Sequence, residues 1–180
     1  MAQVFAFEPP ERFVAGTVGV PGERTFFLQA RGNGRLVSVV LEKVQVSLLA
    51  EKLEELLAEA QRRFGVTVPE PTEPEDNGPL ETPLDEEFRV GTLGLAWDGE
   101  TGTVVIEAIA VGDYESEEPT EEELAKLDRL RVRLTPAATR AFIKRAKKVV
   151  AAGRPPCPLC GLPLDPTGHL CPRHNGYRGR

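Results

Sequence analysis

The sequence predicts an α+β fold of two repeated units, each a β-meander plus a helix, with a mostly antiparallel sheet and a small zinc-knuckle tail. The phrase Phe13-Val-Ala-Gly-Thr-Val-Gly-Val returns as Phe88-Arg-Val-Gly-Thr-Leu-Gly-Leu. Each copy is followed by a turn, an apolar strand and a strand that leads into a helix, which indicates an internal duplication. Two unrelated glycine-rich hairpins would give the same likeness, and that alternative stays open. All cysteines and histidines gather near the C-terminus, which indicates the tail.

The first unit contains the clearest local signals for strands and a helix. Asn33-Gly34 lies between two apolar runs, which is the strongest short signal for a β-hairpin. Ser47 is expected to cap a helix over Leu48–Arg63, because serine favours the N-cap position. The strands expected in this unit are Gln3–Phe7, Phe13–Val20, Thr25–Ala30 and Leu36–Val46.

A stretch rich in proline and acid separates the two units. Between Pro69 and Glu87 there are five prolines, eight acidic residues and no Lys or Arg. So little apolar content predicts a flexible linker that tolerates shortening. The predicted division of residues 1–153 is a unit at 1–66, a linker at 67–87 and a unit at 88–153, followed by the tail at 154–180.

The second unit resumes with strands and ends in a well-marked helix. An apolar strand is expected over Thr103–Val111, and an exposed acidic loop over Gly112–Asp128. Thr120 begins a Thr-x-x-Glu sequence, so a short helical turn with a capping box is expected there. Thr135 is expected to cap the last helix, with Pro136 at its first position.

The tail carries the residues of a metal site. Cys157 and Cys160 form a Cys-x-x-Cys turn that is followed by glycine, and Cys171 supplies a third thiolate. Either His169 or His174 completes a Cys₃His set. Such a set is closed, with no position for water, and it favours a structural zinc ion. An odd number of cysteines at this spacing also argues against a disulfide framework.

These motifs resemble an uncharacterised actinobacterial family, domain of unknown function 3090, whose members have a zinc-ribbon-like ending. The family has no established activity, so the resemblance implies no function. It implies His169 as the fourth metal ligand, because family members commonly have a small residue at the position of His174. The sequences that carry the resemblance are Gly16-Thr-Val-Gly, Leu134-Thr-Pro, Cys157-Pro-Leu-Cys-Gly, Pro163-Leu-Asp-Pro, Gly168-His, Cys171-Pro-Arg and Asn175-Gly-Tyr-Arg.

Charge is divided unevenly along the chain. The net charge is -6, yet twelve Lys/Arg and only one acid lie from Arg129 to the end. Such asymmetry indicates either contact with a polyanion or attraction between the two halves. We expect the acidic segment Gly112–Asp128 to cover the last helix within the same chain. The residues expected to contact a polyanion, were one bound, are Arg140, Lys144, Lys147, Lys148, Arg173 and Arg178.

Catalytic motifs are missing from the sequence. Both histidines lie in the tail, none of the three serines lies in a nucleophile elbow, and no phosphate loop is present. Glu107 is the one acid in a strongly apolar strand, and it is expected to point to solvent. No signal peptide or membrane-spanning run is found, so we expect a cytoplasmic protein without membrane contacts.

We therefore predict a non-enzymatic binding or adaptor protein that has a protein partner and a zinc tail that stiffens its interaction surface. One alternative is a nucleic-acid-binding module that uses the basic C-terminal third. A further alternative is an enzyme with an unrecognised metal-dependent site, which would need an open coordination position on the metal.

Overall fold

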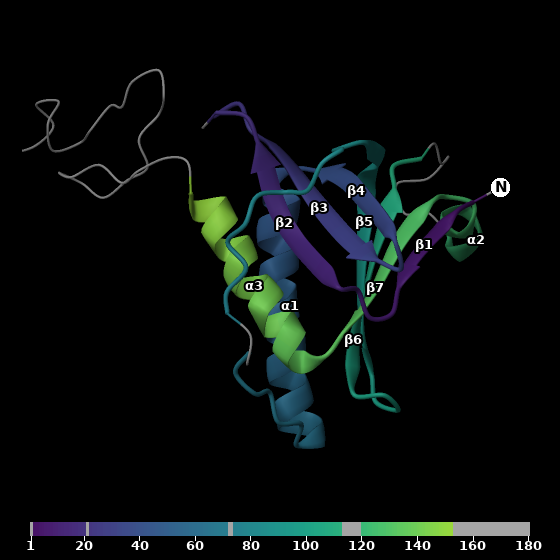
Figure 1. Cartoon of the computed structure of the whole chain (residues 1–180). Coiled ribbons are helices and arrows are strands. Elements are labelled where there is room, and N and C mark those ends of the chain that lie inside the picture. Colours follow the sequence, from purple (N-terminus) through teal and green to yellow (C-terminus); the bar gives the residue numbers. More distant parts are fainter. Residues whose placement is uncertain (1, 21, 72–73, 113–119, 153–180) are drawn as a thin grey trace, which may run out of the picture.

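Seven strands form one sheet in the part of the chain that the computed structural model describes, namely residues 2–20, 22–71, 74–112 and 120–152. The strand order across the sheet is β1-β7-β6-β5-β4-β3-β2. Helices α1 and α3 lie side by side on one face of the sheet (Figure 1). The elements are β1 Val4–Phe7, β2 Arg12–Val18, β3 Thr25–Gly32, β4 Arg35–Leu41, α1 Lys43–Phe64, β5 Glu86–Asp98, β6 Thr103–Ala110, α2 Glu121–Ala125, β7 Arg129–Leu134 and α3 Pro136–Ala151.

The strand pairing is mostly antiparallel, as the sequence predicts. Pairs β2–β3, β3–β4, β5–β6 and β6–β7 are antiparallel, whereas β4–β5 and β1–β7 are parallel. Along the chain, four strands precede the long helix α1 and three precede the long helix α3, with the short α2 inserted before β7. A duplicated origin of the two halves stays a prediction.

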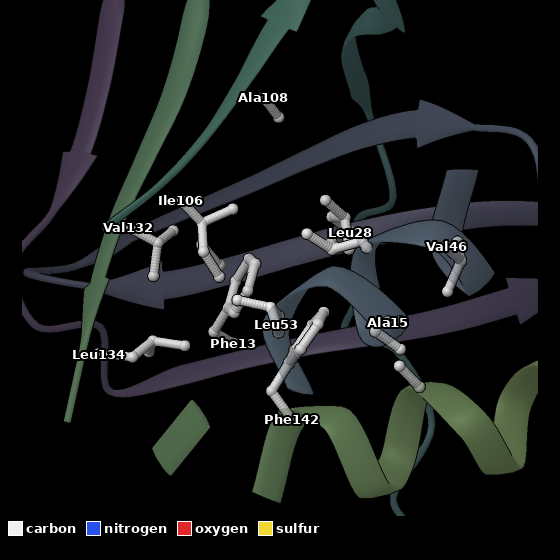
Figure 2. Packing of buried hydrophobic residues seen from close by; sticks show 14 of the residues in the cluster. Phe13, Ala15, Leu28, Val46, Leu53, Ile106, Ala108, Val132, Leu134 and Phe142 are labelled. Carbon is white, nitrogen blue, oxygen red and sulfur yellow. The ribbon is translucent and has the colours of Figure 1, made fainter. Parts of the chain in front are cut away.

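The core lies between the sheet and the two long helices. The rings of Phe13 on β2 and Phe142 on α3 stack with centroids 4.6 Å apart. Leu53 of α1 and Ile106 of β6 belong to the same buried cluster (Figure 2). Side chains alternate between the two faces of a strand. On β3, for example, Leu28 and Ala30 belong to the core, and Gln29 between them faces the other side of the sheet. On this second face of the sheet, Gln29 contacts Glu81, and Arg129 forms an ion pair with Glu107.

Several local predictions are confirmed by backbone geometry. Asn33 and Gly34 have φ of 52° and 75°, which is the left-handed pair required by a tight hairpin turn. The hydroxyl of Thr135 accepts a hydrogen bond from the backbone N–H of Ala138 at 3.1 Å and so caps α3. Thr120 forms the expected capping box at the start of α2. Short-range side-chain chemistry decides all three features.

The start of the first long helix differs from the prediction. Strand β4 ends at Leu41, and Glu42 is the N-cap of α1, where it forms a capping box with Gln45. Val46 is buried on the helix face that packs on the sheet, and Ser47 lies inside the helix. The valines in this stretch favour a strand by propensity, but their spacing to the leucines that follow matches the helix period, and burial decides the outcome.

The segment between α1 and β5, residues 66–85, is here called the strap, and the structure describes its residues 66–71 and 74–85. In Figure 1 it runs from the lower end of α1 past α3 and then across β2. Leu80 packs on β2 at Gly16, where a Cβ atom would come within 2.5 Å of the leucine side chain. The backbone of Glu81 is hydrogen-bonded on the same sheet face. The segment that the sequence predicts as a flexible linker thus makes specific contacts in its described part, where backbone and charged groups are bound in addition to the apolar contact of Leu80.

Candidate functional site: the strap over helix α3

Helix α3 presents its basic residues away from the core. Its buried residues are Thr139, Phe142, Ile143 and Ala146, which lie on the face that packs against α1 and the sheet. The helix period then places the remaining positions toward solvent and the strap. The basic residues at these positions are Arg140, Lys144, Arg145, Lys147 and Lys148.

The first part of the strap contacts this basic side with its carboxylates. Arg140 donates to Glu70 at 2.8 Å, and both Lys144 and Lys148 pair with Glu75. Hydrogen bonds from Lys144 and then Lys148 lower the pKa of the Glu75 carboxyl to about 2. The same contact raises the pKa of Lys144. Two lysines one helical turn apart thus share one carboxylate of the strap.

Arg12 at the start of β2 holds the middle of the strap. Its Nε and Nη2 donate to the two carboxylate oxygens of Asp76 at 2.6 and 3.0 Å. Its Nη2 also lies 3.2 Å from the carbonyl oxygen of Gly78 and 3.0 Å from that of Pro79. The hydrogen bond from Arg12 lowers the pKa of Asp76. A forked guanidinium suits this combination of one carboxylate and two peptide carbonyls.

Arg145 joins three parts of the fold. Its Nε donates to the carbonyl oxygen of Ala15 on β2 at 2.8 Å, and its Nη1 donates to the carbonyl oxygen of Asp76 at 2.8 Å. Its side chain is only 11% exposed, and burial lowers the pKa of its guanidinium. Arg145 therefore fixes α3 and the strap to the free edge of the sheet and contributes little open basic surface.

A buried amide holds the strap on the second sheet face. Gln29 of β3 is 1% exposed, and its Nε2 donates to the carbonyl oxygen of Glu81 at 3.0 Å. Its Oε1 accepts from the backbone N–H of Glu81 at 2.8 Å, and Nε2 also lies 3.1 Å from the Ser38 hydroxyl. The Arg31 guanidinium pairs with the Glu81 carboxylate at 2.9 Å and lowers its pKa. One strap residue is thus held through both its backbone and its side chain.

A cavity of about 480 Å³ lies between the strap, α3 and the start of β2. Ala138, Ala141 and Phe142 of the helix line one side of it, and Pro71 and Pro74 of the strap line the other. Lys144, Arg145 and Lys148 also border it. This volume is within the range of about 300–1,000 Å³ that is usual for small-molecule sites. It leaves room beside the ion pairs for an additional side chain or a small ligand.

The structure brings together four of the residues predicted to contact a polyanion: Arg140, Lys144, Lys147 and Lys148. All four lie on α3, and each pairs with an acid of the same chain, Lys147 with Glu54 of α1. The other two, Arg173 and Arg178, lie outside the described residues. So do the predicted metal ligands Cys157, Cys160, His169 and Cys171 and the alternative ligand His174. Within the described ranges, no group of three or more His, Cys, Asp or Glu is placed to hold a metal ion.

In the described ranges, the acidic segment that contacts α3 is the strap, whereas the sequence analysis selected Gly112–Asp128. The described part of Gly112–Asp128 contacts β7 and the N-terminus instead: Arg129 donates to the carbonyl oxygen of Leu124 at 2.6 Å, and Asp128 accepts from the N–H of Gln3 at 2.8 Å. Residues 113–119 are outside the described ranges. The strap takes the covering position because it leaves α1 beside α3 and must pass that helix to reach β5 (Figure 1).

The basic residues of β7 are paired across the sheet. Arg129 and Arg131 both contact Glu107 of β6, at 3.2 and 3.3 Å, so this acid faces outward and is partly exposed, as predicted. Arg133 donates to Asp98 at 2.7 Å, and this contact lowers the pKa of Asp98. Opposite charges on neighbouring strands stabilise the pairing register. These arginines therefore add little net positive potential to the surface of α3.

Three residues of the site were missed by the sequence analysis: Arg12, Gln29 and the structural role of Arg145. Gln29 gave a usable signal, since it is a polar amide inside the apolar strand Thr25–Ala30. A buried amide needs partners, and an extended backbone supplies them. Arg12 and Arg145 gave no such signal, because their partners are distant in the sequence.

Comparison with protein families shows the family to which the chain belongs. The family model described as "Protein of unknown function (DUF3090)" matches residues 5–171. The chain belongs to this family. A search of curated proteins and a search of solved structures each find no match. The DUF3090 match includes the strap, α3 and the sequence as far as Cys171. Among the described helices of this DUF3090 protein, none has the length and hydrophobicity needed to cross a bilayer.

Proposed function

We propose that this DUF3090 protein is a non-enzymatic cytoplasmic binding protein or adaptor, with the basic side of α3 as its interaction surface. A structural zinc ion in the C-terminal tail would stiffen the chain next to that surface. The observation that carries the proposal is the grouping of four cations on one side of one helix. Each of them keeps a third or more of its side chain exposed although it is paired.

The position of the tail supports a joint role with α3. The helix ends at Ala151, and the Cys-x-x-Cys turn begins six residues later at Cys157. Cys₃His sets bind zinc in a closed tetrahedron that organises short segments. His169 is proposed as the fourth ligand and His174 as its alternative. A zinc-ordered tail with further arginines would extend the basic surface of α3.

Nucleic acid is a less favoured ligand for this surface. Phosphate binding needs clustered Lys and Arg, which α3 supplies. Single-stranded nucleic acid also needs aromatic side chains on which bases stack. Among the described residues that line the cavity at α3, the aromatic ones are Phe13 and Phe142, which stack on each other and are buried. An enzyme is also less favoured, since the described ranges contain no His or Cys that could serve as base or nucleophile.

The proposal is tested by capture of partners from native cell extract on the immobilised full-length chain. The test variant is Lys144→Gln/Lys147→Gln/Lys148→Gln. The control is Lys52→Gln/Arg62→Gln/Arg63→Gln, which removes the same charge from exposed positions on α1. We expect a protein that the wild type and the control retain and the test variant loses, and that rebinds in purified form after nuclease treatment.

Two results would contradict the proposal. The first is equal retention of every bound protein by the test variant and the control. The second is loss of all α3-dependent binding after nuclease treatment, with recovery when RNA or DNA is added back. The second result would establish the nucleic-acid alternative.

A further inference from the structure

The strap is held by two kinds of contact that differ in burial. Asp76 and Glu81 are held by partly buried arginines and by the buried amide of Gln29. Glu70 and Glu75, by contrast, contact α3 through carboxylates at the surface: the side chain of Glu70 is 82% exposed and that of Lys144 is 61% exposed. Exposed ion pairs contribute little to stability. The two glutamate carboxylates are therefore the part of the strap that another anion can replace most easily.

We propose that the basic side of α3 recognises an extended acidic segment of a partner protein, and that Glu70 and Glu75 occupy this surface as a built-in competitor. This inference rests on the function proposed above and adds the class of partner and its regulation. The strap is itself an extended acidic peptide seated on these cations. The charge complementarity between the strap and α3 therefore indicates that the surface accepts an extended acidic peptide.

The contacts favour a peptide over other anions. Arg140 of α3 donates to the carbonyl oxygen of Val68 at 3.3 Å and to the Glu70 carboxylate at 2.8 Å. Carbonyl acceptors beside a carboxylate are features of a polypeptide, whereas a nucleic acid backbone offers phosphates and sugars. Lys144 and Lys148 then add two cations one helical turn apart, and both bind a single carboxylate.

The cavity next to Lys144 and Lys148 offers space for an apolar side chain of the partner segment. It lies between the small residues Ala138 and Ala141 on α3 and Pro71 and Pro74 on the strap. An apolar side chain placed between two acids of a partner segment would fill this space while the acids reach Lys144 and Lys148. The surface therefore fits a segment in which acidic residues flank small apolar ones.

The competitor acts at high effective concentration because it belongs to the same chain. Removing its charge should therefore strengthen binding of a partner segment without creating any new contact. The probe is a fluorescein-labelled peptide of alternating Glu and Ala, titrated with the full-length protein at low salt and read by anisotropy. The test variant is Glu70→Gln/Glu75→Gln. The control is Glu55→Gln/Glu59→Gln, which makes the same change in net charge on α1.

We expect the test variant to bind the peptide about three to ten times more tightly than the control, given the usual size of surface ion pairs. Adding Lys144→Gln and Lys148→Gln to the test variant should remove that gain. Equal binding by the test variant and the control overturns the competitor role. A gain for a labelled RNA oligonucleotide with none for the peptide overturns the acidic-peptide partner. In either case a partner lost on α3 substitution in the capture experiment would leave the proposed function standing.

Discussion

The Arg145 guanidinium and the Ala15 carbonyl are 2.8 Å apart, and this hydrogen bond ties α3 to the free edge of strand β2. An edge strand exposes carbonyl groups that would otherwise pair with water or with another chain. Here a helix side chain satisfies one of them and, through its second nitrogen, also holds the strap at Asp76. One arginine thus connects helix, sheet and strap.

Replacing Arg145 should destabilise the fold more than replacing any other cation of α3. Arg145→Ala removes hydrogen bonds to two backbone carbonyls, and we expect a loss of about 1–3 kcal/mol in the free energy of unfolding. Lys147→Ala, at an exposed position of the same helix, should change it by less than about 0.5 kcal/mol. Urea denaturation followed by circular dichroism measures both values. Equal losses for the two variants would show that Arg145 has no structural role.

Gln29 should contribute to the stability of the fold through its hydrogen bonds to the strap. Gln29→Leu keeps a similar volume but leaves the backbone N–H and carbonyl of Glu81 without their partners. An unsatisfied buried group costs about 1–3 kcal/mol, so a loss of that size is expected on urea unfolding. Amide hydrogen exchange locates the effect: protection should fall at Glu81. A stable variant with unchanged exchange there would contradict this account.

The zinc proposal makes a separate prediction about the tail. Protein purified without added metal should contain one zinc ion per chain, held by three thiolates and one imidazole. If His169 is the fourth ligand, His169→Ala should lose zinc to a chromophoric chelator faster than the wild type, and His174→Ala should not. Faster loss from His174→Ala would select the alternative ligand. Less than about half an equivalent of zinc in the purified protein, together with three freely titrating thiols, would exclude the site.

Local signals in the sequence were sufficient for most elements. The Asn33-Gly34 turn and the Thr135 cap depend on residues within a few positions of each other, so the sequence contains the whole interaction. The boundary at Glu42 was missed because strand propensity and helix periodicity compete there, and packing of Val46 decides. A sequence pattern ranks such alternatives poorly when burial overrides propensity.

The candidate site was predicted only in part, for a related reason. The basic side of α3 follows from the helix period, and all four predicted contacts on α3 lie together. The contact of the strap with this side of α3 could not be predicted from the sequence, because it depends on pairs such as Arg12 and Asp76, which are 64 residues apart. The composition of the strap predicts a flexible linker. In the structure, ion pairs and backbone hydrogen bonds connect it to β2, β3 and α3. Long-range pairs between charged groups leave no periodic trace in a sequence.

Stability should fall on acidification through the carboxylates of the strap. The pKa values of Glu75, Asp76 and Glu81 are lower in the folded chain than in the unfolded chain because cations bind their charged forms. The folded state therefore binds these protons less tightly, and the associated stability is present above the unfolded pKa values. It is lost as pH falls from about 4.5 toward 2, the ordinary and shifted values for Glu75.

Neutral variants isolate this contribution. Glu75→Gln/Glu81→Gln cannot titrate at those two positions, so its urea midpoint should fall less steeply than that of the wild type over the acidic range. Between about pH 6 and 8 both carboxylates are ionised in either state. There the two proteins should give parallel curves, with the variant lower because its ion pairs to Lys144 and Arg31 are missing. The same acidic slope in both proteins would mean that the strap carboxylates are not coupled to folding, and that other acids cause the loss.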